Sequence, residues 1–103
     1  IDGARVIEEK EHAETSWFGV PIVYEGNKVQ LVKYLEDNKI QTRNYFAGNI
    51  LRHPGYKHLD SYANYPNSSK VLDNVFFLGC SPVITDPMID YIEEVVTKFR
   101  NEL

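Results

Sequence analysis

An almost continuous apolar run from Val75 to Cys80 constrains the fold of this chain most strongly. Such a run is typical of a central strand that is covered on both faces, because a strand open to water alternates apolar and polar residues. Ser81 and Pro82 end the run. The rest of the chain must therefore supply elements that pack on a sheet.

Residues 28–37 are expected to form the first of these elements, a helix. Asn27 is a favoured N-cap, and Asn38 is expected to close the helix in the left-handed conformation. The three-and-four spacing of apolar residues predicts one buried stripe, made of Leu31, Val32 and Leu35.

A second, longer helix is expected at the C-terminal end of the sequence. Asp86 is expected to be its N-cap, with Pro87 at the favoured first position. A shorter helix is expected from Pro66 to Leu72. The buried stripe of the long helix is predicted as Ile89, Ile92, Val96, Phe99 and Leu103.

Two further strands are expected. Apolar residues alternate from Ser16 to Tyr24, which predicts a half-buried strand, and Pro21 places it at a sheet edge or a bulge. Residues 40–46 are expected to form the next strand, while residues 1–15 read as a connector or a short strand. The order strand, helix, strand, loop, helix, strand, helix predicts an α/β sandwich, in which helices pack on a small sheet that need not be all parallel.

Charge and composition exclude several classes of protein. The 103-residue chain fits one domain, and its net charge of −4 argues against general binding of nucleic acid. No run is long and apolar enough to suggest a membrane span. Cys80 is the only cysteine, so no internal disulfide is expected, a cytoplasmic location is expected, and Cys80 is predicted to be a buried, inert thiol.

The span between Asn38 and Leu59 contains no Asp or Glu. It carries four of the eleven Lys and Arg residues, so its formal charge is +4, while the rest of the chain carries about −8. Clustered donors of this kind favour an anionic ligand such as a phosphate or a carboxylate. The alternative is a solvated loop whose cations pair with acids from elsewhere in the chain.

Familiar catalytic motifs are absent from the sequence. There is no glycine-rich phosphate loop, no His-Glu-x-x-His pair and no Gly-x-Ser-x-Gly turn. His53 and His58 are too irregularly placed to predict a metal site. Trp17 and the tyrosines are expected in the core or at interfaces rather than as a stacking platform.

Three blocks of sequence resemble the C-terminal domain of the DegT/DnrJ/EryC1/StrS sugar aminotransferases, which are pyridoxal-phosphate enzymes of the aspartate-aminotransferase fold. They are residues 16–22 (Ser-Trp-Phe-Gly-Val-Pro-Ile), residues 34–43 and residues 78–85. Within the family, Ser-Trp-Phe-Gly and the stretch from Thr42 to Pro54 are similar to the dehydratase branch, which includes CDP-4-keto-6-deoxyglucose 3-dehydrase and the lipopolysaccharide protein RfbH. The third block reads Leu-Gly-Cys-Ser-Pro where the family normally has Leu-Pro-Leu-His-Pro.

The resemblance implies a division of labour. Residues 1–15 are then a connector from a large domain, and residues 16–103 are the small C-terminal domain that closes over a nucleotide sugar, with a CDP-sugar favoured. Pyridoxal or pyridoxamine phosphate is expected in the full-length parent and not on this fragment, which is expected to hold no catalytic residue and no metal. The expected substrate-binding residues are Arg43, Asn49, Arg52 and His53, with the two arginines leading because a guanidinium suits a phosphate.

Other interpretations stay open. The same domain of a nucleotide-sugar aminotransferase is the nearest alternative, and a non-catalytic interaction module is another. The first residue, Ile1, is not preceded by a methionine, which suggests a piece of a longer chain. The parent is expected to be a homodimer in the cytoplasm, and the dehydratase branch implies a reductase partner. The exact sugar, and any iron-sulfur cluster in the parent, lie beyond the sequence.

Overall fold

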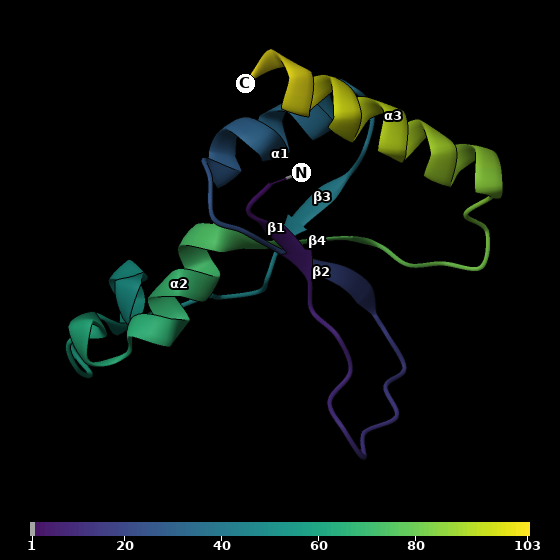
Figure 1. Cartoon of the computed structure of the whole chain (residues 1–103). Coiled ribbons are helices and arrows are strands. Elements are labelled where there is room, and N and C mark those ends of the chain that lie inside the picture. Colours follow the sequence, from purple (N-terminus) through teal and green to yellow (C-terminus); the bar gives the residue numbers. More distant parts are fainter. Residues whose placement is uncertain (1) are drawn as a thin grey trace.

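A computed structural model describes residues 2–103 as four strands, three α-helices and three short 3-10 helices. The chain runs through the four strands and three α-helices shown in Figure 1, and the short helices follow β3. In chain order the elements are β1 (Ala4–Val6), β2 (Gly19–Tyr24), α1 (Lys28–Asp37), β3 (Thr42–Asn44), η1 (Ile50–Arg52), η2 (Pro54–Tyr56), η3 (Tyr62–Asn64), α2 (Pro66–Asn74), β4 (Val75–Gly79) and α3 (Asp86–Glu102).

The strands form one sheet in the order β1-β2-β4-β3, and every neighbouring pair is antiparallel. The apolar run therefore does form an inner strand, β4, which pairs with β2 on one side and with β3 on the other. Part of residues 1–15 joins the sheet as β1, at its edge. The expected mixed fold, a small sheet with helices packed on it, is confirmed.

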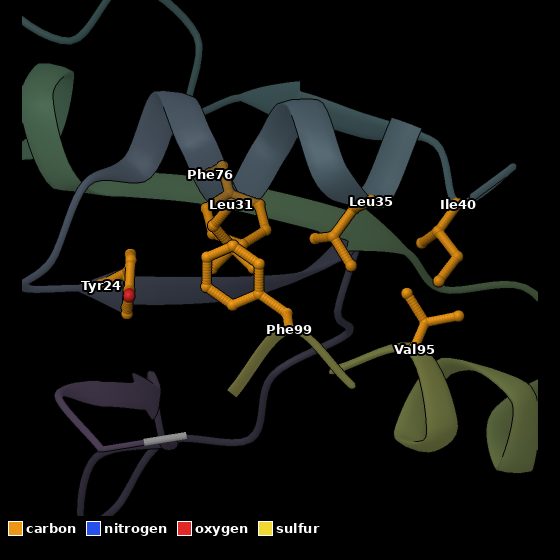
Figure 2. Close-up of a cluster of buried hydrophobic side chains, with 7 residues drawn as sticks. All are labelled: Tyr24, Leu31, Leu35, Ile40, Phe76, Val95 and Phe99. Atoms are coloured by element: carbon orange, nitrogen blue, oxygen red, sulfur yellow. The ribbon is translucent and has the colours of Figure 1, made fainter. Parts of the chain in front are cut away.

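The hydrophobic core lies between one face of the sheet and the helices α1 and α3, which lie side by side in Figure 1. Phe76 of β4 is 1% exposed, and the rings of Tyr34 and Phe99 join the two helices with centroids 5.2 Å apart. Figure 2 shows how side chains from five segments meet there: Tyr24, Leu31, Leu35, Ile40, Phe76, Val95 and Phe99. The stripe predicted for residues 28–37 is confirmed, with Val32 at its partly buried margin.

Helix α1 begins as predicted but ends differently. The Asn27 side chain accepts a hydrogen bond from the Gln30 amide, as an N-cap does. At the other end Asn38 has φ −98°, and Lys39 takes the left-handed conformation at φ 68°. The amides of Lys39 and Ile40 donate to the carbonyls of Glu36 and Leu35, which is a Schellman motif that starts one residue later than expected.

Helix α3 differs from its prediction in its cap and its buried stripe. Thr85 is the N-cap, because its hydroxyl accepts from the Met88 amide, and Asp86 is the first helical residue. The buried positions are Val95 and Phe99, with Ile92 and Val96 partly buried. Ile89 and Leu103 were predicted in the stripe but are 53% and 66% exposed, because α3 contacts the core only through its middle, from Ile92 to Phe99.

The strand predictions need two corrections. Pro21 lies in an inner strand rather than at a sheet edge. Its carbonyl accepts from the Ile7 amide, just beyond the end of β1. The side of Pro21 that lacks an N–H therefore points to where the β1–β2 pairing ends, so no strand hydrogen bond is lost. The strand expected over residues 40–46 is limited to Thr42–Asn44, because Ile40 completes the Schellman motif and Phe46 turns to φ 50°. Helix α2 runs two residues past its predicted end, to Asn74.

Cys80 is exposed, so the prediction of a buried thiol is wrong. Strand β4 ends at Gly79, and its burial falls along its length from Val75 and Phe76 to the exposed Gly79. The apolar run therefore corresponds to a strand that is buried at its beginning but exposed at its end.

Replacing Leu35 by alanine should lower the free energy of unfolding by about 2–5 kcal/mol, because it leaves a cavity in a packed core. Leu35 is 1% exposed, whereas Val29 on the same helix is 74% exposed. Val29→Ala is the matched control and should change stability by less than about 0.5 kcal/mol. Denaturant titrations of both variants test this, and equal losses would show that α1 does not pack as described.

Candidate functional site

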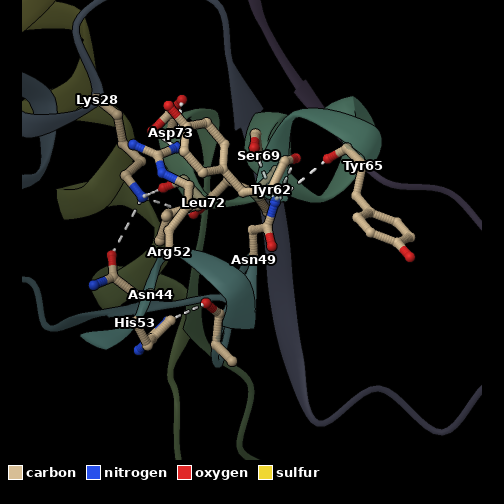
Figure 3. Close-up of polar contacts among 12 residues, drawn as sticks. Lys28, Asn44, Asn49, Arg52, His53, Tyr62, Tyr65, Ser69, Leu72 and Asp73 are labelled. Carbon is tan, nitrogen blue, oxygen red and sulfur yellow. Dashed lines mark hydrogen bonds and ion pairs between the residues drawn. The ribbon is translucent and has the colours of Figure 1, made fainter. Parts of the chain in front are cut away.

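Residues 45–74 run from the end of β3 to the end of α2, and we call them the site segment. They contain three of the four predicted ligand residues. Asn49 organises the segment. The side chain is 3% exposed: its Oδ1 accepts from the Leu51 amide (3.1 Å), and its Nδ2 lies 3.0 Å from the hydroxyl of Ser69 and 3.4–3.5 Å from the carbonyls of Tyr62 and Tyr65 (Figure 3). Asn49, predicted to bind a sugar, therefore directs its polar atoms into the segment itself.

Gly48 fixes how closely the segment approaches α2. Its φ is 62°, and a Cβ at this position would lie 2.5 Å from the Cβ of Leu72. Only glycine combines this conformation with this contact at low cost. The turn before Asn49 is thereby pressed against the helix that Asn49 also contacts.

Arg52 is paired inside the chain. Its Nη1 lies 3.0 and 3.1 Å from the two carboxylate oxygens of Asp73 on α2, and its guanidinium lies 5.8 Å from the centre of the Tyr62 ring. The span around Arg52 lacks acids in sequence, but the fold brings Asp73 to it. The positive charge of the span is partly neutralised at this point, as the alternative of a loop paired with distant acids predicts.

His53 and Arg43 are placed differently from one another. The exposed His53 sets its Nε2 2.7 Å from the Ala47 carbonyl, so Nε2 carries the proton and donates. Arg43 lies on the edge strand β3 directly opposite Phe77, and it is exposed. Within residues 2–103 it forms no hydrogen bond or ion pair through its side chain. Arg43 is thus the predicted ligand residue whose guanidinium is available in full.

Lys28, which the sequence analysis did not single out, lies at the centre of this region. It is 9% exposed, and its Nζ donates to the carbonyls of Leu72 (2.6 Å) and Val75 (3.1 Å) and approaches Oδ1 of Asn44 (3.3 Å). Figure 3 shows these contacts converging on the ammonium group. Asn44 immediately precedes the site segment and Val75 immediately follows it, so one buried cation holds both of its ends.

The pKa of Lys28 is lowered because burial removes the ammonium from water, while the carboxylate of Asp73 acts in the opposite direction. A signal for this residue exists in the sequence. Lys28 precedes Leu31 and Leu35 by three and seven residues, so it falls on the buried stripe of α1. A lysine on an apolar stripe needs acceptors, and the fold supplies them from three other elements.

Two exposed carboxylates hold local structure, Asp60 within the site segment and Glu36 at the start of β3. The backbone amide of Ser61 lowers the pKa of Asp60, helped by hydrogen bonds from Tyr65 and Asn64. The amide and hydroxyl of Thr42 likewise lower the pKa of Glu36, to which the more distant charge of Arg43 contributes. Both carboxylates hold local structure, so neither is a candidate acid or base.

Three other findings bear on the kind of site. An apolar groove of about 630 Å³ lies where Leu78 and Ile40 meet the first turns of α3, at Met88 and Tyr91. Throughout residues 2–103, no three His, Cys, Asp or Glu side chains come together as a metal site requires. In the same part of the chain, no helix has the length and apolar character needed to span a membrane.

Comparison with known proteins gives a consistent result. The sequence profile of the DegT/DnrJ/EryC1/StrS aminotransferase family matches residues 1–99. The chain is 38% identical over 97 residues to a dTDP-4-dehydro-2,6-dideoxy-D-glucose 3-dehydratase of Saccharopolyspora spinosa, covering 85% of the chain and 20% of that protein. It is 36% identical over 99 residues to the lipopolysaccharide biosynthesis protein RfbH of Salmonella typhimurium, covering 90% of the chain and 22% of that protein.

Among solved structures, the chain is similar to an E. coli GDP-4-keto-6-deoxy-D-mannose-3-dehydratase with bound hydrated PLP. The TM-score is 0.71 at 26% identity, over 89% of this chain and 25% of that one. The chain thus spans about a fifth of the length of the curated relatives that it matches. The resemblance found in the sequence, to this family and to its dehydratases, is confirmed.

Replacing Lys28 by methionine should loosen the site segment selectively, because two backbone carbonyls and Asn44 lose their buried donor. We expect the free energy of unfolding to fall by about 1–3 kcal/mol. Hydrogen exchange should accelerate more in residues 45–74 than in α1 or α3. Lys33→Met is the matched control, because Lys33 lies on the same helix, is 74% exposed and pairs only with Asp37. Uniform acceleration over the whole chain would contradict the clamping role of Lys28.

Proposed function

The chain belongs to the DegT/DnrJ/EryC1/StrS aminotransferase family, and from this premise we propose that it is the C-terminal, substrate-closing domain of a nucleotide-sugar 3-dehydratase. The parent enzyme depends on pyridoxal or pyridoxamine phosphate and acts in deoxysugar biosynthesis for lipopolysaccharide or O-antigen. Supporting this, one relative and one solved structure are named 3-dehydratases of 4-keto deoxysugar nucleotides, and another relative is named a lipopolysaccharide biosynthesis protein. The proposal includes a cytoplasmic homodimer that receives electrons from a reductase partner.

The buried amine of this chain bears on where the cofactor of the parent is held. Among residues 2–103 the buried amine is Lys28, whose Nζ already contacts Asn44, Leu72 and Val75, so it is not free to form a Schiff base with pyridoxal phosphate. We therefore propose that the cofactor is held outside residues 2–103, and that this chain alone neither binds it nor turns over a sugar. When bound in the parent, the cofactor supplies an electron sink for loss of the sugar hydroxyl.

The observation that carries the role of this domain is the free guanidinium of Arg43 on a fold whose other predicted arginine is already paired. We propose that Arg43 binds the diphosphate of the nucleotide sugar. Arg52 contributes through the N–H groups that Asp73 does not use. His53 contributes through Nδ1, which accepts from a sugar hydroxyl because Nε2 carries the proton. Asn49 has no polar atom left for a ligand, so we assign it to the architecture of the segment.

The closing role draws on the apolar groove beside α3. Exposed side chains with apolar surface line it, with Met88 53% and Tyr91 43% exposed. Apolar patches of this kind mark contacts with other protein. We propose that this groove packs against the rest of the parent when the domain closes over the substrate.

The reaction is tested with the full-length parent, supplied with pyridoxamine phosphate, a reductant and CDP-4-keto-6-deoxyglucose. A dehydratase yields a product that has lost the 3-hydroxyl, detected by mass spectrometry. A product that gains an amino group from glutamate identifies the nearest alternative, a sugar aminotransferase. Absence of both products, with the protein folded, would favour a non-catalytic interaction module and contradict the proposal.

Replacing Arg43 by alanine in the parent should weaken apparent substrate affinity about tenfold or more, because a hydrogen bond to a charged group contributes roughly 1.5–3 kcal/mol. Arg43→Lys should recover only part of the loss, since an ammonium cannot make a forked contact. Lys57→Ala is the control, because Lys57 is another exposed cation of the acid-free span. Steady-state kinetics decide: an equal effect at Lys57 would reduce the role of Arg43 to general charge, and no effect at Arg43 would remove it from the site.

A further inference from the structure

Five aromatic side chains gather on the sheet face opposite to the core, and we call them the aromatic cluster. The Phe77 ring is its centre: its centroid lies 5.9 Å from those of Phe18 and Phe46 and 6.2 Å from that of Tyr45. Phe18 and Phe46 stack at 6.4 Å with an interplanar angle of 30°. With Trp17 these rings line a pocket of about 220 Å³.

The cluster is open to solvent. Phe18 is 77% exposed and Phe46 71%, while Trp17 and Tyr45 are each 40% exposed. The core helices lie on the other face of the sheet, so nothing in residues 2–103 covers the outer faces of these rings. Exposed aromatic faces gathered around a hollow mark a binding site more than a core, because a core would hide them from water.

The backbone holds Phe46 in this exposed position at a cost in free energy. Its φ is 50°, in the left-handed region that a bulky side chain rarely adopts. The Phe46 amide donates to the Asn44 carbonyl at 2.7 Å, which fixes the turn. A strained residue whose ring gains so little burial is typical of a functional site.

A free cation lies on the same face. Arg43 of β3 is directly opposite Phe77 of β4, and directly opposite residues of an antiparallel pair project from the same side of the sheet. Gly19 of β2 leaves room for the Phe77 ring, because a Cβ there would lie 2.4 Å from it. The face thus offers flat apolar walls beside an unpaired guanidinium.

We propose that the aromatic cluster is the base-binding subsite of a nucleoside diphosphate, with the base stacked between the rings and the diphosphate on Arg43. The proposal rests on the nucleotide-sugar function proposed above and adds to it the place of the base. Stacking on aromatic rings is possible for every base, because each base has a π-face. The aromatic walls of the pocket therefore recognise the base of the nucleotide, and the positive charge of Arg43 recognises its phosphates.

Trp17 makes the subsite directly observable, because it is the only tryptophan of the chain and it lines the pocket. Its fluorescence is followed while the chain is titrated with cytidine 5′-diphosphate, with free N-acetyltryptophanamide correcting for absorption by the base. We expect saturable quenching by the nucleotide and none by inorganic pyrophosphate, which has no ring. Quenching by cytidine alone should need higher concentrations, since it lacks the phosphates.

Three variants separate the contributions. Phe18→Ala should weaken binding of the nucleotide on the order of tenfold, as loss of a stacking partner does. Arg43→Ala should weaken binding of the nucleotide but not of cytidine. Val83→Ala is the matched control, because Val83 is also 77% exposed and lies outside the cluster, and it should bind like the unmodified chain.

The proposal is overturned if the nucleotide does not quench Trp17, or if pyrophosphate quenches it over the same concentrations. It is also overturned if Phe18→Ala dissociates an oligomer while the nucleotide leaves Trp17 unquenched, because the cluster is then a protein interface. The reaction of the parent is a separate readout. If the Phe18→Ala parent turns over substrate normally, the proposed function stands and this subsite is wrong. If nucleotide binding depends on Phe18 but the parent shows no turnover, the subsite stands and the proposed function is wrong.

Discussion

Strand β4 is the element on which both sides of the molecule depend, because it pairs with β2 and β3 at once. On one face it buries Phe76 against α1 and α3, and this removal of apolar surface from water stabilises the fold. On the other it presents Phe77 to the aromatic cluster. Alternation along a single strand thus divides a stabilising face from a face available for binding.

Lys28 holds together the two ends of the site segment, which neighbouring strands bring to the same place. Thirty residues separate the end of β3 from the start of β4, and the two strands are neighbours, so the intervening site segment must leave and return at the same place. An ammonium group in contact with Asn44, Leu72 and Val75 joins exit and return to the first turn of α1. Burying that charge is costly, which the lowered pKa of Lys28 reflects, and three neutral oxygens compensate for it.

Family membership and the geometry of this domain agree on what it can contribute. The chain belongs to the DegT/DnrJ/EryC1/StrS aminotransferase family, and Lys28, the buried amine of its described residues, is held by three oxygens of the domain itself. Its exposed groups include the guanidinium of Arg43, open aromatic rings and an apolar groove beside α3. Groups of these kinds are suited to binding an anionic or aromatic ligand or to packing against protein.

The sequence by itself determined the elements, because the patterns that predict them are local: the run of β4, the alternation of β2, the Asn27 cap and the stripe of α1 follow from neighbours within a few residues. Family motifs likewise identified the class of protein. Tertiary structure decided which charges remain free, since ion pairs form between residues distant in sequence. Asp73 lies 21 residues from Arg52 and neutralises it, so the acid-free span was a poor guide to its charge. Cys80 was misplaced, and the stripe of α3 was shifted, because burial at the end of an element depends on where its neighbours stop.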